Sequence, residues 1–187
     1  MKEEKGKDKV VEYTIASGPA HLYMLGMIIP VLLVYAGSFI FVWNYDELRS
    51  GIVFFVEYFI PVIIAGVIIH EILHGIGWSL YLHNGFKSIK FGFNWKFLSP
   101  YCHCREPLKV WQYIVGAALP LIILGILPAF IGILLGNSSI LFFGVIFTWV
   151  AGGDIISLLM LSKLDKDIYI YDHPDKLGFY TRVRPEI

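Results

Sequence analysis

The chain has 187 residues, of which 57% are hydrophobic and 16% charged, whereas a typical soluble domain has roughly 45–50% apolar and 25% charged residues. Its 15 basic and 15 acidic side chains balance, which leaves no basic field for nucleic acid and excludes that class of partner. The wealth of apolar and aromatic residues excludes an intrinsically disordered chain. The composition therefore predicts an integral membrane protein.

Four apolar segments are long enough to cross a bilayer, which takes about 20 residues of helix. We expect these spans at about 22–43, 52–82, 110–135 and 140–161. The first segment is too long for the hydrophobic region of a cleavable signal peptide, so we expect it to remain as an anchor. The predicted fold class is an all-α integral membrane protein, built as a four-transmembrane-helix bundle.

The basic residues of the connecting segments predict the orientation of this bundle. The N-terminal tail has four Lys, the first loop one Arg, the second loop five basic residues, the third none, and the C-terminal tail five. Because basic residues stay on the cytoplasmic side, both termini and the long second loop are predicted to be cytoplasmic. The chain then divides into a cytoplasmic tail (1–21), a four-span membrane domain (22–161) and a second cytoplasmic tail (162–187). We expect this multi-pass protein in a plasma or inner membrane, since outer membranes hold barrels.

The second loop carries the only strand-like pattern. Between residues 88 and 97, apolar residues alternate with polar residues and glycine, the apolar ones being Ile89, Phe91, Phe93, Trp95 and Phe97. A period of two predicts a small cytoplasmic-side β-strand or hairpin. Its aromatic face could rest on the bundle at the headgroup level. Alternatively, its free edge could pair with an extended peptide.

The second span contains His70-Glu71-Ile72-Leu73-His74, which has the spacing His-Glu-x-x-His. On a helix, residues i and i+4 share a face, so both imidazoles can bind one zinc ion while Glu71 acts as general base on the water that the zinc activates. Ionisable side chains are unfavourable within a membrane helix, so three of them in five residues favour a shared metal ion. The alternative is that they line a polar cavity or lie beyond the headgroups.

Asp154 is the predicted third ligand, because catalytic zinc sites usually hold three protein ligands. It is the only charged residue of its span, and Gly152 and Gly153 beside it allow another helix to pack closely. Asp154 and His74 both stand about 11 Å from the predicted cytoplasmic ends of their helices, so they can lie at one depth. Alternatively, Asp154 is a neutral carboxylic acid that is hydrogen-bonded within the bundle.

A second cluster of possible ligands lies in the second loop. It consists of Cys102, His103 and Cys104, with Glu106 nearby. Cytoplasmic thiols stay reduced, but a single Cys-x-Cys lacks the paired spacing of a structural zinc site. A second metal site and an ordinary loop both remain open.

From about residue 60 to 180, the chain resembles the membrane family known as the putative zincin peptidases. The resemblance is carried by three motifs and the aromatic strand, in their order along the chain. The motifs are His70-Glu71-x-x-His74-Gly75, Tyr101-Cys102-His103-Cys104-Arg105-Glu106-Pro107-Leu108 and Gly153-Asp154. More distantly, the chain is similar to the site-2 protease group of intramembrane zinc metalloproteases. That resemblance implies zinc-ligand roles for His70, His74 and Asp154, a general-base role for Glu71, and strands that engage substrate. The chain departs from that group where Gly153-Asp154-Ile155 replaces Leu-Asp-Gly.

These features predict a membrane zinc metallopeptidase that hydrolyses peptide bonds within or next to the bilayer, near its cytoplasmic side. Its cofactor would be Zn²⁺, and its substrate a membrane protein or a peptide. One alternative is a non-enzymatic membrane protein that binds or handles zinc with the same ligands. Another is a structural or interaction protein with a vestigial site.

Overall fold

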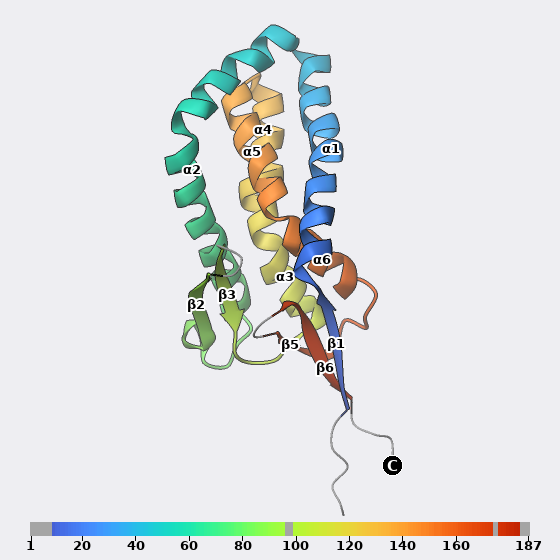
Figure 1. Ribbon diagram of the computed structural model, residues 1–187. Coiled ribbons are helices and arrows are strands. Elements are labelled where there is room, and N and C mark those ends of the chain that lie inside the picture. The colour runs from blue at the N-terminus through green and yellow to red at the C-terminus, as the bar shows by residue number, and fades with distance from the viewer. Residues whose placement is uncertain (1–8, 96–98, 174–175, 184–187) are drawn as a thin grey trace, which may run out of the picture.

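The computed structural model describes residues 9–95, 99–173 and 176–183 (Figure 1). Its α-helices are α1 (Ser17–Val42), α2 (Tyr45–Ser79), α3 (Val110–Pro120), α4 (Leu127–Leu135), α5 (Ser138–Val150) and α6 (Gly152–Leu161). A 3₁₀ turn covers Gly85–Ser88, and a π-helical segment, Leu121–Ile126, joins α3 to α4. The strands are β1 (Lys9–Ile15), β2 (Ile89–Asn94), β3 (Ser99–Cys104), β4 (Leu108–Lys109), β5 (Tyr169–Asp172) and β6 (Leu177–Val183). The protein is therefore mostly helical with small sheets.

Among the described residues, three helical stretches are long and apolar enough to cross a membrane, which identifies a membrane protein. They are Gly18–Val42, Phe55–Ser79 and Val110–Leu135. Helices α5 and α6 meet at a bend of 54° and would form a fourth crossing if the pair is one span. The bundle turns apolar side chains outward, as at Leu33 (70% exposed) and Phe41 (91%), which suits a lipid surround.

Helix α2 begins earlier than the predicted span at 52–82. Its N-cap is Asn44, whose side chain accepts a hydrogen bond from the backbone N–H of Glu47 (2.9 Å). The first turn also contains Asp46 and Glu47, whose negative charges are favourable at a helix N-terminus. A hydropathy pattern detects only the apolar part of a helix, so it misses this polar first turn.

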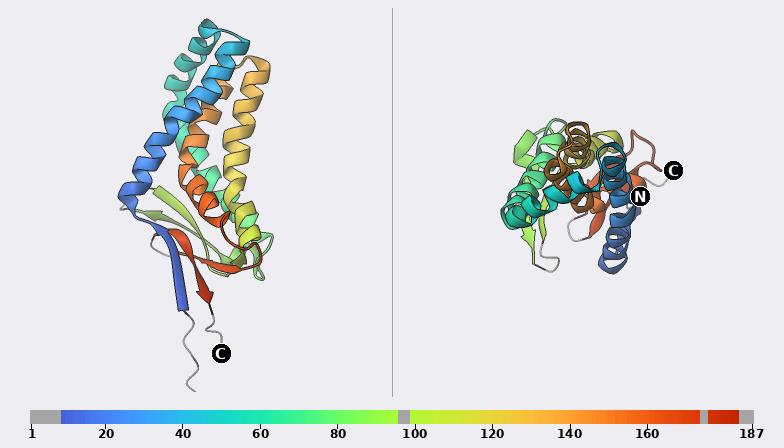
Figure 2. Two further views of the ribbon diagram at one scale, coloured as in Figure 1. Left: turned by 90° about the vertical axis from the view of Figure 1, so that its right-hand side faces the viewer. Right: turned by 90° about the horizontal axis from the view of Figure 1, so that it is seen from above.

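The two predicted tails contain strands that pair with each other. β1 lies antiparallel to β6, from Lys9↔Val183 to Ile15↔Leu177, and the four-stranded sheet has the order β1-β6-β5-β4. Both ends of the described chain therefore lie at the same end of the bundle (Figures 1 and 2). The sheet packs on the bundle through a core that includes Phe179, Ile170, Leu108 and Trp78.

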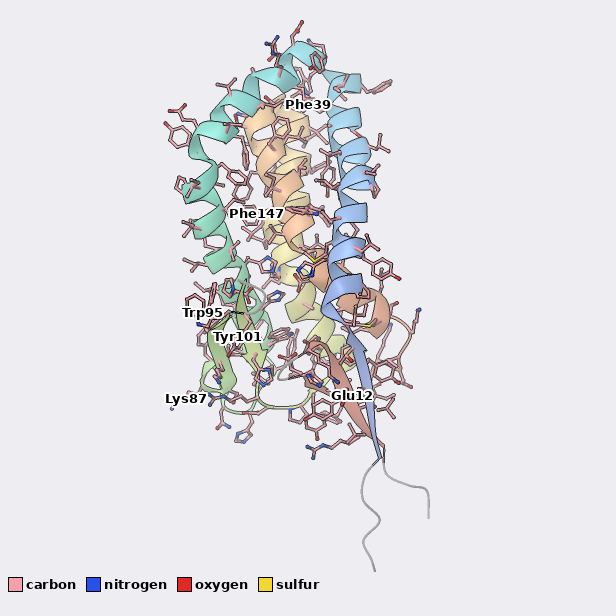
Figure 3. All side chains as sticks on the ribbon, in the orientation of Figure 1. Glu12, Phe39, Lys87, Trp95, Tyr101 and Phe147 are labelled. Carbon is pink, nitrogen blue, oxygen red and sulfur yellow. The ribbon has the colours of Figure 1, made fainter. Side chains whose placement is uncertain are left out.

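The second loop forms the predicted β-hairpin. β2 pairs with β3 from Ile89↔Cys104 to Asn94↔Ser99, while Phe97 of the predicted strand lies outside the described residues. The hairpin contacts α2 at Gly75, where an added Cβ would lie 2.8 Å from the Phe91 ring. Trp95, at the end of the hairpin, is 80% exposed (Figure 3). The hairpin thus lies directly beside the C-terminal half of α2.

Candidate metal site

Helix α2 brings His70 and His74 together on one buried face. Each residue is only 5% exposed, and their Nε2 atoms lie 3.1 Å apart. The spacing of four residues, which is close to one helical turn, accounts for this arrangement. The two rings meet edge to face, and their Nε2 atoms face each other.

Asp154 approaches these histidines from the first turn of α6, just after the bend. Its Oδ2 lies 3.1 Å from His70 Nε2 and its Oδ1 lies 3.2 Å from His74 Nε2. Within the described part of the chain, these three residues are the only group of at least three His, Cys, Asp or Glu whose ligand atoms all lie within 4.8 Å of one another. The structure thus joins the three residues that the sequence singled out as metal ligands.

The donor set fits a zinc ion. A tetrahedral zinc with bonds of ~2.0–2.1 Å holds its ligand atoms about 3.3 Å apart. The two Nε2 atoms lie 3.1 Å apart, and each faces a different oxygen of Asp154 at 3.1 or 3.2 Å, while one ligand atom taken from each residue gives a set within 4.8 Å. The Nδ1–H of His74 donates to the Gly116 carbonyl oxygen (3.0 Å). This bond leaves a lone pair on His74 Nε2, facing the carboxylate oxygens of Asp154, an arrangement that a shared cation stabilises.

The ring of His70 is held at one side only. Its buried Nδ1 has no hydrogen-bond partner among the described residues. Its Nε2, by contrast, contacts both His74 and Asp154. The polar contacts of this ring therefore converge at the point where a metal ion would bind.

Helix α3 orients His74 of α2 directly through the Gly116 carbonyl oxygen and indirectly through the Tyr113 carbonyl oxygen, which holds Trp78 of α2. The Trp78 indole stacks on the His74 ring, with centroids 5.1 Å apart and an angle of 13°, and donates to the Tyr113 carbonyl oxygen (3.0 Å). Gly116 allows this close approach, because an added Cβ would overlap the Trp78 indole. Sequence reasoning missed both residues: Trp78 stands four residues after His74 in the same helix, a spacing that could have found it, whereas nothing in the sequence links Gly116 to His74.

Glu71 lies beside the cluster and is partly buried. Its carboxylate interacts with the charges of His70, His74 and Asp154, and it accepts a hydrogen bond from the backbone N–H of Cys102 in β3. The hairpin therefore reaches the candidate site directly. This arrangement places a carboxylate that can carry a proton next to the metal-binding atoms.

The second cluster of possible ligands is part of β3 and its following turn. Cys102 and Cys104 are free thiols, and burial raises the pKa of Cys104 to about 12 and that of Cys102 further, so both stay protonated at neutral pH. His103 Nδ1 lies 2.9 Å from Asp172 Oδ2. The polar partners of this cluster include the Asp172 carboxylate and the Glu106 carbonyl oxygen, and the described ranges contain no second group of three closely spaced metal-binding side chains.

Residues 63–169, more than half of the chain, match the family model described as "Putative zincin peptidase". The matched range contains His70, Glu71, His74 and Asp154. No curated protein and no solved structure matches the chain significantly.

Proposed function

The chain belongs to the family described as "Putative zincin peptidase", and on that premise we propose that it is a zinc metallopeptidase that hydrolyses peptide bonds within or next to the bilayer. The observation that carries this proposal is the convergence of His70, His74 and Asp154 beside Glu71. Two imidazoles and a carboxylate form a donor set typical of catalytic zinc.

In this proposal, His70 Nε2, His74 Nε2 and a carboxylate oxygen of Asp154 hold the zinc ion. When bound, zinc acts as a Lewis acid and makes water nucleophilic at neutral pH. Glu71 takes a proton from the attacking water and passes it to the leaving amine of the scissile peptide. The Cys102 amide holds the Glu71 carboxylate beside the histidines, and the Gly116 carbonyl fixes the tautomer of His74.

We further propose four crossings, with α5 and α6 together forming the fourth. The pairing of β1 with β6 places both tails at one end of the bundle, which supports an even number of crossings. The basic residues of the tails and second loop assign that end to the cytoplasm. His74 stands five residues from the end of α2, on the side of the sheets, so cleavage would occur near the cytoplasmic face of a plasma or inner membrane.

The substrate in this proposal is a membrane protein or a peptide, as in the site-2 protease group. A helical substrate has to unwind locally, because a helix shields its own carbonyls. The hairpin β2–β3 is suited to hold the unwound segment, since β3 reaches Glu71. Strand pairing would supply main-chain hydrogen bonds along the extended segment.

Metal content and cleavage test this function together. The full-length protein is purified in detergent, zinc per chain is measured by mass spectrometry, and cleavage of co-expressed candidate membrane proteins is followed. We expect about one zinc per wild-type chain, loss of zinc in His70→Ala and Asp154→Ala, and retained zinc without cleavage in Glu71→Gln. Glu57→Gln, at an exposed acidic residue of the same helix, is the matched control and should behave like the wild type.

Three results would contradict the proposal in different ways. A wild-type chain without zinc, or zinc that is indifferent to His70→Ala and Asp154→Ala, would remove the metal site. A Glu71→Gln variant that cleaves at the wild-type rate would remove Glu71 from the mechanism. Zinc that is lost in His70→Ala and Asp154→Ala and exchanges across vesicle membranes, without cleavage of any candidate, would favour the metal-handling alternative.

A further inference from the structure

Asp172, at the end of β5, lies at a junction of three elements outside the candidate metal site. Its Oδ1 accepts a hydrogen bond from the Tyr113 hydroxyl of α3 (3.0 Å). Its Oδ2 accepts one from the backbone N–H of Cys104 (3.1 Å) and lies 2.9 Å from His103 Nδ1, both in β3. The Asp172 side chain is only 12% exposed. A largely buried carboxylate thus connects the C-terminal strand to both the hairpin and the bundle.

The same edge of β3 contacts Glu71. Backbone amides two residues apart in a strand point to the same side, so the amides of Cys102 and Cys104 both face away from β2. The first donates to Glu71 and the second to Asp172. Asp172 therefore anchors the strand whose neighbouring amide holds the Glu71 carboxylate.

A second connection runs from Asp172 through aromatic side chains to His74. The Tyr113 ring packs on Trp78, with centroids 4.8 Å apart, and Trp78 stacks on His74. Tyr113 and Trp78 are both buried, so a rotation of one ring has to displace the other. The hydroxyl bond to Asp172 is the polar contact that holds Tyr113 in this stack.

We propose that Asp172 is a positioning residue: it holds β3 and Tyr113 so that Glu71 and His74 keep the orientation that the site requires. The inference rests on the proposed function for the roles of Glu71 and His74. It extends the site beyond the family match, which ends at residue 169, into the C-terminal sheet. The C-terminal segment is then part of the catalytic architecture.

The charge of Asp172 makes the proposal testable with an isosteric change. All three partners of the carboxylate are donors: a hydroxyl, a backbone amide and an imidazole N–H. In Asp172→Asn, the side-chain oxygen keeps both β3 donors only if the NH₂ turns to the Tyr113 hydroxyl, which must then accept instead of donate, and the bonds to β3 lose the negative charge that strengthens them. The matched control is Asp167→Asn, because Asp167 lies on the same segment but is 73% exposed and pairs with Lys109.

Two measurements on the full-length protein in lipid vesicles test the proposal, one on the hold of Asp172 on β3 and one on the metal ligands. The first is the alkylation rate of Cys102 and Cys104 by N-ethylmaleimide, which reports release of β3. The second is the ligand-field absorption spectrum after loading with Co²⁺ in place of zinc, which reports the orientation of the metal ligands. For Asp172→Asn we expect alkylation about tenfold faster, as a weakening of the charge-assisted bonds to β3 by ~1.4 kcal/mol would allow, and a shifted cobalt spectrum at unchanged stoichiometry. Asp167→Asn should match the wild type in both.

Unchanged alkylation in Asp172→Asn would show that the carboxylate does not hold β3 and would overturn the proposal. Faster alkylation with a wild-type cobalt spectrum would show a purely structural role and would also overturn it.

If Asp172→Asn does not fold, Tyr113→Phe serves instead, since it removes one donor and leaves the β3 bonds intact. It should shift the cobalt spectrum with little change in alkylation, and an unchanged spectrum would contradict the aromatic connection. A wild type that binds no cobalt would contradict the proposed function, whereas the thiol rates would still decide whether Asp172 holds β3.

Discussion

Glu106 fastens the turn between α2 and the hairpin. Its carboxylate accepts hydrogen bonds from the Ser88 hydroxyl, from the side-chain amide of Asn84 (2.9 Å) and from the backbone N–H of His83 (2.9 Å). These hydrogen bonds stabilise the charged carboxylate, and the bond from Ser88 has the largest effect. They lower the pKa of Glu106 to about 2 from an ordinary value of 4.5. One carboxylate thus holds the backbone of the turn between α2 and the hairpin.

The depressed pKa of Glu106 predicts a pH dependence of stability. The folded-state pKa lies below the unfolded-state value, so the contribution is complete above about pH 4.5 and is lost as the pH falls through about 2. We expect Glu106→Gln to melt at a lower temperature than the wild type at pH 7, with the difference shrinking toward pH 3. Thermal unfolding in detergent at pH 7, 5 and 3 measures this, with Glu57→Gln as control. A difference that is constant with pH would contradict the role of the charge.

At the scale of single residues, local patterns predicted most of the candidate metal cluster. His70 and His74 follow from helical spacing alone. Asp154 was predicted as the only charged residue of an apolar span, and the structure brings it to both histidines. Asp172 gave no such signal, because it lies in a polar tail and its partners come from β3 and α3. Only spatial proximity distinguishes it from other tail carboxylates.

At the scale of elements, the contact of α2 with α3 determines how His74 is held. A Cβ on Gly77 would lie 2.6 Å from Gly116 Cα, so the two glycines allow the helix backbones to approach closely. The Gly116 carbonyl reaches His74 for the same reason. Small residues at a helix crossing within a membrane have this effect in general.

Gly116→Ala tests this contact. The added Cβ would overlap Trp78, so we expect a loss of about 1–3 kcal/mol in the free energy of unfolding from overpacking. We also expect zinc affinity to fall roughly 10–100-fold, because the carbonyl that orients His74 moves away. Thermal unfolding and competition with a chelator measure the two effects. Gly37→Ala is the control, since its Cβ would meet nothing within 4 Å, and equal zinc affinity in the two variants would contradict the prediction.

The helices were predicted more fully than their breaks. The apolar run at 140–161 predicted one span, whereas the structure has α5 and α6 with a bend of 54° between them. No proline marks the bend, which falls beside Gly152 and Gly153. Hydropathy measures length and polarity but not direction, and paired small residues permit a kink without requiring one. The bend nevertheless places Asp154 at the histidines.

At the scale of the whole molecule, the sheet that joins the two tails constrains the path of the chain. β1 precedes the first helix and β6 follows the last, and the two strands pair along their length. The connection between α1 and α2 lies at the opposite end of the bundle (Figure 1). The proposed four crossings therefore place that connection and the tails on opposite sides of the membrane.

Cysteine labelling tests the proposed topology. In a background in which Cys102 and Cys104 are replaced by Ser, a single cysteine is placed at Asp46 or at Lys166, which are both exposed. We expect a membrane-impermeant maleimide to label Asp46→Cys on intact cells and Lys166→Cys only after permeabilisation. Labelling of both positions from the same side would contradict the four crossings.

The sequence by itself determined the membrane class, the helical architecture, the hairpin in the second loop and the identity of a candidate metal cluster. These properties depend on composition and on periodicity over a few residues, which local physics relates directly to structure. The tertiary structure alone decided the sheet between the tails, the bend before Asp154 and the residues around His74 and Glu71. Tyr113, Gly116 and Asp172 act through contacts between segments that are distant in the chain, and a one-dimensional pattern carries no record of such contacts.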